Sequence, residues 1–229
     1  QVSPALTGDE TCARTTYVRN TTAWLMDPVA EAKVTAGLCN VDPATATVLT
    51  HQRTYYDGAS ALTTAPTRGN PTKVEQLVDT PTGKVFRTTA STTVDAHGRP
   101  STATDAKGRV TTASYTPATG TPLRQVGTTS ADPDGAGALT AHTTTQVFDT
   151  RWGAPTSSTA PDGTVTDAAL DPLGRVTSVW LPGRAKATYP TAPSTKVAYL
   201  IQANGPNAVT TETLSPAGAY LKSVQLSDG

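Results

Sequence analysis

The sequence has few of the large aliphatic side chains that fill the core of a globular protein. Leu, Ile, Val and Phe together number 37 of 229 residues, about 16%, with a single Ile at position 201. This share lies below the roughly 20% under which disorder is the usual interpretation of a composition. High net charge, the second mark of disorder, is missing, because 18 basic residues balance 18 acidic ones. The deficit excludes a thick apolar core, a coiled coil and a helix bundle, but not an ordered β-protein.

Long apolar runs, basic clusters and metal-binding patterns are also missing. The longest strongly apolar run, Val197 to Ile201, is far shorter than the about 20 residues of a membrane-spanning helix. No run of Lys or Arg exceeds two residues and the formal net charge is zero, which argues against nucleic acid or an acidic membrane as a partner. The three His residues are scattered and no C-x-x-C motif occurs. We therefore expect no metal site and no cofactor.

Cysteine is nearly absent, and the only two are Cys12 and Cys39. A disulfide between them is favoured, and it indicates an oxidising compartment, so that the protein is secreted or lies on the cell surface. The alternative is a pair of buried free thiols in a cytosolic protein. Such a bridge stabilises by roughly 3–4 kcal/mol on the loop-entropy model. Because the chain begins at Gln1 rather than Met, we expect it to be a segment of a longer polypeptide, with any export signal upstream.

What the sequence does contain is Thr, at 46 residues, and Ala, at 33. Runs such as 14–24 and 46–58 carry Thr, Val and aromatic residues at the density of β-strands, and Asp-Gly and similar turn pairs separate such runs. The pattern predicts an all-β chain of repeated antiparallel β-hairpins. A helix over Asp27–Leu38 is the less favoured alternative to a hairpin or loop closed by a Cys12–Cys39 bridge. We expect a long exposed loop over Thr129–His142.

One motif recurs along the chain: an aromatic or apolar residue, then Asp, then Gly and often Arg, then a Thr-rich run. In each hairpin the Asp carboxylate is expected to accept hydrogen bonds from turn amides, and the Gly to supply the left-handed backbone conformation. The Arg that follows is expected to pair with an Asp of a neighbouring unit. The repeat positions are Tyr56, Asp57, Gly58, Asp95, Gly98, Arg99, Asp105, Gly108, Arg109, Asp149, Gly153, Asp171, Gly174 and Arg175.

These units resemble the YD repeats of RHS-repeat proteins, whose consensus is similar to Y-D-x-x-G-R followed by a Thr-rich strand. The phrases RTYYDG, GRVTTASYTPATG, RWGAPTSSTAPDG and GRVTSVWLPGR are similar to secreted RHS proteins of actinobacteria. The resemblance covers essentially the whole chain. It implies a β-sheet that curves or spirals into a shell, with residues 1–50 as an N-terminal β segment and residues 51–229 as YD-repeat sheet. The chain departs from the pattern where Val94, Thr104, Phe148 and Leu170 replace Tyr before Asp.

The resemblance favours a structural function over two others. The first hypothesis is a scaffold or shell segment of an extracellular protein that encloses or presents a toxin or effector. Its partners would be adjacent repeats of the parent chain, or other copies that pair at open sheet edges. The alternative is a carbohydrate-binding or cell-surface adhesion module that stacks surface glycans on Trp24, Trp152 and Trp180, although packing is the favoured role of these rings.

An enzyme ranks last. The chain has no G-x-S-x-G motif. The segment DPLGR, at residues 171–175, is similar to the motif at the self-cleaving end of larger family members, but it continues directly into another repeat. We therefore expect no catalytic residue.

Overall fold

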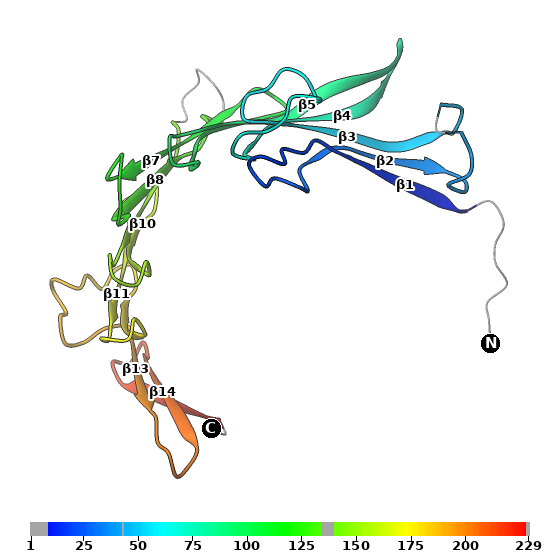
Figure 1. Ribbon diagram of the computed structural model, residues 1–229. Helices are drawn as coiled ribbons and strands as arrows, with labels where there is room; N and C mark the ends of the chain where they lie inside the picture. The colour runs from blue at the N-terminus through cyan, green and yellow to red at the C-terminus, as the bar shows by residue number, and fades with distance from the viewer. Residues whose placement is uncertain (1–8, 43, 134–139, 228–229) are drawn as a thin grey trace. The chain divides into compact units, whose positions relative to one another are not determined.

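The computed structural model describes residues 9–42, 44–133 and 140–227, shown in colour in Figure 1. Within these ranges the chain forms β-strands and turns and no helix. The strands are β1 (Thr11–Tyr17), β2 (Val29–Ala36), β3 (Val48–Tyr56), β4 (Pro71–Thr80), β5 (Gly83–Val94), β6 (Pro100–Asp105), β7 (Val110–Thr116), β8 (Gln125–Thr129), β9 (Thr143–Phe148), β10 (Pro155–Thr159), β11 (Val165–Leu170), β12 (Val176–Trp180), β13 (Thr195–Leu200), β14 (Asn207–Leu214) and β15 (Tyr220–Ser227).

All fifteen strands belong to one sheet, and their order in the sheet is their order in the chain. Each strand therefore lies beside its sequence neighbours, and the pairs are antiparallel, as in β1–β2 and β14–β15. Successive hairpins need only short connections, which the turn-forming residues between the strands provide. The prediction of an all-β chain of repeated antiparallel hairpins is confirmed. The two edge strands of this sheet are β1 and β15.

The chain divides into two compact units, Gln1–Thr112 and Ala113–Gly229, with the boundary inside β7. The first unit contains β1 to β6, and the second contains β8 to β15. The division between residues 1–50 and 51–229 expected from the sequence falls inside β3. It stays a prediction about where the repeats begin.

Few side chains are buried, because the described strands form a single layer. Apart from Pro and Gly, the described apolar residues with less than 9% exposure are Cys12, Val18, Ala30, Tyr55 and Trp180. A sheet that no second layer covers leaves most side chains half-exposed, so large apolar residues such as Leu, Ile and Phe would gain little from burial there. The low content of large aliphatic residues therefore reflects the architecture of the sheet.

The N-terminal edge of the sheet is fastened covalently. Residues Val29–Ala36 form β2, paired with β1 along its length, so the hairpin is confirmed and the helix over Asp27–Leu38 is not formed. Cys12, with no exposed surface, is bonded to Cys39 beyond the end of β2. The Arg14 guanidinium adds to this closure by donating to the carbonyls of Cys39 (2.7 Å) and Val41 (3.1 Å).

The expected loop at Thr129–His142 joins β8 to β9, which end at Thr129 and begin at Thr143. Its residues 134–139 lie outside the described part of the chain. At its base, the Ser130 amide donates to the His142 carbonyl over 2.9 Å. Among the described residues, no helix has the length and apolarity to cross a membrane.

Candidate functional site: repeat turns and a hydroxyl-lined groove

The Asp of the repeat motif closes its own hairpin turn. In the turn between β5 and β6, Asp95 Oδ1 accepts the amides of His97 (2.8 Å) and Arg99 (2.9 Å), and Oδ2 accepts Arg99 Nε (2.6 Å). Gly98 takes φ = 78° there, which a glycine adopts without steric cost. The same pairing joins Arg109 to Asp105 and Arg175 to Asp171, each over 2.7 Å between Nε and Oδ2. The expectation that Asp accepts turn amides is confirmed.

The expectation that each Arg reaches a neighbouring unit is wrong for these three turns. The Arg lies four residues after the Asp, and the tight turn brings its guanidinium back onto the same carboxylate. The turn at Asp149 lacks an Arg after Gly153. Here Arg151 forms the ion pair instead, with its Nη2 3.0 Å from Asp149 Oδ2. The carboxylate of each of these four Asp residues is therefore paired with an Arg of its own turn.

Asp57 is held differently, by the long connection between β3 and β4. Its Oδ2 accepts the amides of Thr67 (2.8 Å), Arg68 (2.9 Å) and Gly69 (3.0 Å), and Oδ1 accepts the amide of Asn70 (3.0 Å). Burial alone would raise the pKa of this carboxyl, but the four amides lower it to about 2. One carboxylate thereby fixes the far end of the loop, which runs from Asp57 to Asn70, against the start of β4.

Successive turns at the same ends of the strands also contact one another. In the first unit, Arg68 Nη1 donates to the carbonyl of Ala96 over 3.0 Å, which ties the β3–β4 loop to the β5–β6 turn. In the second unit, Trp152 of the β9–β10 turn lies on Gly174 of the β11–β12 turn. A Cβ at Gly174 would come within 2.7 Å of Trp152 Cγ. The glycine is therefore needed for close approach as well as for its φ of 80°.

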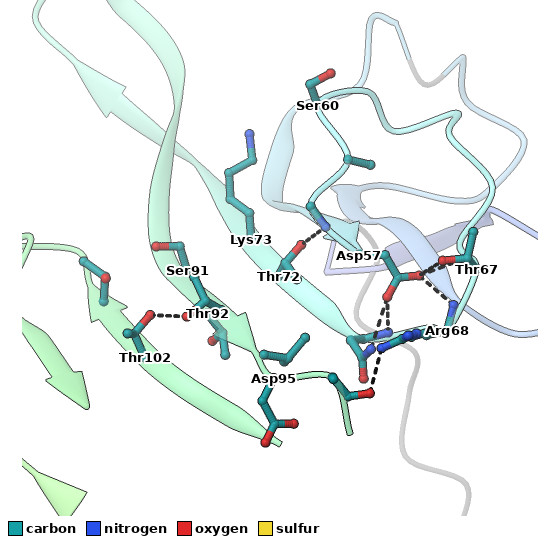
Figure 2. A pocket seen from close by; sticks show the side chains of 17 residues that line it. Asp57, Ser60, Thr67, Arg68, Thr72, Lys73, Ser91, Thr92, Asp95 and Thr102 are labelled. Atoms are coloured by element: carbon teal, nitrogen blue, oxygen red, sulfur yellow. Dashed lines mark hydrogen bonds between the residues drawn. The ribbon is translucent and has the colours of Figure 1, made fainter. Parts of the chain in front are cut away.

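An open groove of about 860 Å³ lies on the first unit between the β3–β4 loop and strands β5 and β6. Figure 2 shows Asp57, Thr67 and Arg68 on one side of it and Ser91, Thr92 and Thr102 on the other. Ser91 is the register partner of Thr104, and Thr93 is that of Thr102. Register partners project from the same face of a sheet, so these two pairs form a continuous row of hydroxyls.

The charged side chains that line the groove are already engaged by the protein. Asp57 is held by loop amides and Asp95 by Arg99, while Arg68 donates to a backbone carbonyl. Lys73 Nζ lies 2.9 Å from Glu75 Oε1 and 3.7 Å from the centroid of the Tyr55 ring. These two acids and two bases leave the lining with no net charge. The groove therefore offers hydroxyls beside charged groups that sum to zero.

The three Trp residues differ in exposure, and Trp24 belongs to the first unit while Trp152 and Trp180 belong to the second. Trp24 is 84% exposed in the loop between β1 and β2, and Trp152 is 48% exposed against Gly174. Trp180 is only 4% exposed, and its Nε1 donates to the carbonyl of Tyr189 over 2.8 Å. Trp180 thus offers no open ring for stacking, which corrects its inclusion among the platform residues. A strand-end Trp followed by Leu-Pro-Gly does not by itself show whether a loop folds over the ring.

A charged cluster on the same face of β2, β3 and β5 was not expected from the sequence. Glu31 Oε1 lies 2.9 Å from Arg53 Nε and 3.2 Å from His51 Nε2. The Arg53 guanidinium lies 3.6 Å from the Phe86 ring centroid, and the His51 ring meets Phe86 edge-on. Burial lowers the pKa of His51, partly offset by Glu31. Cross-strand register creates this cluster, and register is not visible in a single sequence.

The carboxyl of Asp171, in the segment DPLGR, is bound within its own turn. Burial alone would raise the pKa of Asp171, but the amide and guanidinium of Arg175 hold it below its ordinary value. A general acid needs the opposite shift. The described residues contain no group of three or more His, Cys, Asp and Glu side chains placed to hold a metal ion.

These features define a class: a β-repeat protein that consists of one antiparallel sheet, in which Asp side chains close the hairpin turns at the strand ends. No protein-family model and no curated protein matches the chain in sequence. Among solved structures, the crystal structure of TcdB2-TccC3 matches with a TM-score of 0.64 and 14% identity, over 96% of this chain. At that identity the match shows a related fold. The present chain spans 15% of the length of the matched chain.

Proposed function

We propose that the chain is a structural segment of an extracellular RHS-type YD-repeat shell, of the kind that encloses or presents a toxin or effector. The observation that carries the proposal is the uninterrupted order of β1 to β15 in one sheet, matched over 96% of its length to TcdB2-TccC3, an RHS/YD-repeat toxin complex. A sheet that grows by adding one hairpin after another can extend to any length, which suits the wall of a shell. In this proposal the chain is a curved part of such a wall and has no enzymatic activity.

The turns support a wall rather than a reactive site. In each described Asp–Arg pair the two opposite charges cancel, which reduces repulsion between successive turns. The Cys12–Cys39 bridge supports secretion or display at the cell surface, because disulfides persist where conditions are oxidising.

The open edge at β15 supports pairing with a further strand. Leu221, Val224 and Leu226 of β15 are 66%, 52% and 63% exposed. An edge strand of this length with apolar side chains is a template for another strand. In the proposed shell this partner is the next repeat of the parent polypeptide, and in the isolated chain it is the edge of another copy.

Association at this edge can be measured by sedimentation velocity over a range of protein concentrations. We expect the wild-type chain to associate, and Leu221→Lys to shift it towards monomer, because a charge on an edge strand opposes pairing. Leu173→Lys is the matched control, since Leu173 is 65% exposed but lies in the β11–β12 turn. A wild-type chain that stays monomeric, or an equal effect of both variants, would contradict pairing at β15.

A further inference from the structure

Strands β13, β14 and β15 carry exposed apolar side chains on one face, next to the β13–β14 turn. Leu200, Ala208 and Leu226 lie opposite one another across the three strands, and the next row on the same face ends in Val224. Leu200, Val224 and Leu226 are 53%, 52% and 63% exposed, and Ile201 beside them is 67% exposed. The four large side chains, Leu200, Ile201, Val224 and Leu226, form the apolar patch.

The same face becomes basic further along the strands. Lys196 and Lys222 each lie four residues from the leucine of their own strand, Leu200 or Leu226, which places them on the same face at a distance of about 13 Å along the strand. Glu212 is the register partner of both lysines. Among the described residues, neither lysine forms an ion pair. Both ammonium groups therefore keep their charge for an external partner.

The loop between β12 and β13 adds two further cations. It packs over Trp180, whose ring projects from the same face as Lys196, because Ser178, two residues before the Trp, is the register partner of that lysine. Lys186 Nζ lies 5.0 Å from the centroid of the Trp180 ring, and Arg184 belongs to the same loop. Neither cation forms an ion pair within the described part of the chain. The basic rim consists of Arg184, Lys186, Lys196 and Lys222.

The zero net charge of the whole chain, which argues against an acidic membrane, hides an uneven distribution. Residues 172–211 contain four basic side chains and neither Asp nor Glu. The described strands place two carboxylates on the face of the basic rim: Glu212 and Asp167, the latter opposite Trp180. The four cations outnumber these two carboxylates. This face therefore carries local positive charge that the chain as a whole lacks.

A second copy that docks through the same face is disfavoured by this charge. In a two-fold arrangement identical surfaces meet, so the basic rim would approach the basic rim of the other copy and like charges would repel. The occupant must instead offer apolar groups where the patch lies and anions near the rim.

A bilayer leaflet with anionic lipids has this order along its normal. Apolar side chains enter the boundary between acyl chains and head groups by roughly 5–10 Å, and long basic side chains reach the phosphates above it. The turn beyond the patch satisfies part of its own polarity. Asn207 Oδ1 accepts the Gln202 amide (3.0 Å), and Gln202 Nε2 donates to the Pro206 carbonyl (2.8 Å). These internal hydrogen bonds lower the cost of bringing the turn into the interface.

We propose that this face of β13–β15 docks on the surface of an anionic phospholipid bilayer, with the apolar patch in the interface and the basic rim against the lipid phosphates. Attachment of this kind is peripheral and needs no membrane-spanning segment. It goes beyond the wall function and does not depend on it.

The test uses the complete 229-residue chain and sucrose-loaded vesicles, either of phosphatidylcholine alone or with about 30% phosphatidylserine. Binding is measured by co-sedimentation at low and at high salt. We expect the anionic vesicles to bind the chain at least about tenfold more tightly than the neutral ones, and salt to weaken that binding. Equal binding to both vesicles, or no binding to the anionic ones, overturns the proposal.

The apolar patch is tested by Leu200→Gln combined with Leu226→Gln. The matched control is Leu173→Gln combined with Leu221→Gln. Both control leucines belong to the same unit and are 65% and 66% exposed, but Leu173 lies in the β11–β12 turn and Leu221 on the opposite face of β15. The patch variant is expected to bind anionic vesicles at least about tenfold more weakly, and the control as wild type. Equal weakening by both pairs overturns the assignment to this face.

The basic rim is tested by Lys196→Gln combined with Lys222→Gln. Lys84→Gln combined with Lys107→Gln removes the same charge from the first unit and is the matched control. We expect about tenfold weaker binding for the rim variant and little change for the control. An equal effect of both pairs would show that only the overall charge matters and would overturn the proposal.

The folded state of each variant is checked by its melting temperature, measured by circular dichroism. The substituted leucines are more than half exposed, so we expect the leucine variants to melt as wild type. If the Gln substitutions at Lys196 and Lys222 lower the melting temperature, Lys196→Arg combined with Lys222→Arg keeps the charge. Loss of vesicle binding in a stable Arg variant would overturn the role of the rim.

Two soluble probes separate other anionic partners from lipid. Polyglutamate that displaces the vesicles, together with an unaffected leucine variant, would show simple charge attraction and overturn docking through the patch. A decapeptide of alternating Glu and Leu that binds more tightly than the vesicles, and needs both the patch and the rim, would overturn the assignment to lipid. Vesicle binding is measured at a protein concentration where sedimentation velocity shows one species. Failure of this proposal is therefore distinguishable from failure of pairing at β15.

Discussion

At the scale of the residue, Asp57 shows how one carboxylate stabilises a long loop. Four backbone amides converge on it, and its pKa falls to about 2. In the unfolded chain an Asp titrates near 3.9. The folded pKa is therefore depressed, so the stabilisation is complete above about pH 5 and is lost as pH falls towards 2.

Asp57→Asn is expected to reduce the free energy of unfolding by about 1–2 kcal/mol at pH 7, after allowance for solvent screening. Its amide group would also place N–H donors against the backbone donors of the loop. Urea unfolding at pH 7, 4 and 2.5 measures the difference from wild type, which should shrink with falling pH. Asp79→Asn is the control, since the Asp79 side chain is 81% exposed and lies 3.8 Å from Lys84. A penalty that is independent of pH would refute the charge explanation.

Gly174 shows a second residue-scale requirement, close approach. Gly174→Ala faces both an unfavourable φ of 80° and the ring of Trp152, 2.7 Å from the new Cβ. Gly163→Ala is a matched control, because Gly163 has the same φ with nothing within 4 Å. We expect about 1–2 kcal/mol of destabilisation for Gly163→Ala and at least about 1 kcal/mol more for Gly174→Ala.

The readouts are thermal unfolding and tryptophan fluorescence. Because Trp152 is 48% exposed and must move away from the turn, its emission should shift to longer wavelength in Gly174→Ala and stay unchanged in Gly163→Ala. Equal losses of stability and unchanged emission in both variants would show that contact between these turns does not matter.

At the scale of the element, the repeating structure is a hairpin that is closed at its turn. It is not a strand that packs onto an apolar core. The Asp–Arg pairs are partly or well exposed, and exposed pairs contribute little free energy on their own. Their effect is to define the turn, and with it the register of the two strands. The β1–β2 hairpin adds a covalent link, since Cys12 in β1 is bonded to Cys39 beyond β2.

Cys12→Ser combined with Cys39→Ser is expected to destabilise the N-terminal edge by about 2–4 kcal/mol. Hydrogen exchange should accelerate in β1, which pairs only with β2 among the described strands, and should stay unchanged in β10 and β11. Non-reducing peptide mapping of the wild type provides the control for the bridge itself. Two free thiols in the wild-type protein, or unaltered exchange in β1 of the variant, would contradict this account.

At the scale of the whole molecule, fifteen strands form one layer and bury very little. Stability therefore depends on neighbour-to-neighbour pairing, as in other quasi-one-dimensional proteins. Among the described strands, β1 and β15 each pair on one side only; β1 is tied by a disulfide, and β15 is exposed from Leu221 to Ser227. The expected association at β15 follows from this asymmetry.

The sequence by itself determined the strand content and the hairpin turns, and it favoured the Cys12–Cys39 disulfide that the structure contains. Thr-rich alternation and Asp-x-x-Gly motifs act within a few residues of chain, so their effects are visible without the fold. It also indicated that Asp95, Asp105 and Asp171 accept amides of their own turns, because those donors lie two and four residues away.

Only the tertiary structure decided which residues meet across strands and between turns. The burial of Trp180, the capture of Asp57 by a loop ten residues away, and the hydroxyl row of Ser91 and Thr104 all depend on register and loop path. A shift of register by one residue would send every side chain of a strand to the opposite face. Such long-range placement is set by the folded sheet, so composition and local spacing could not reveal the groove.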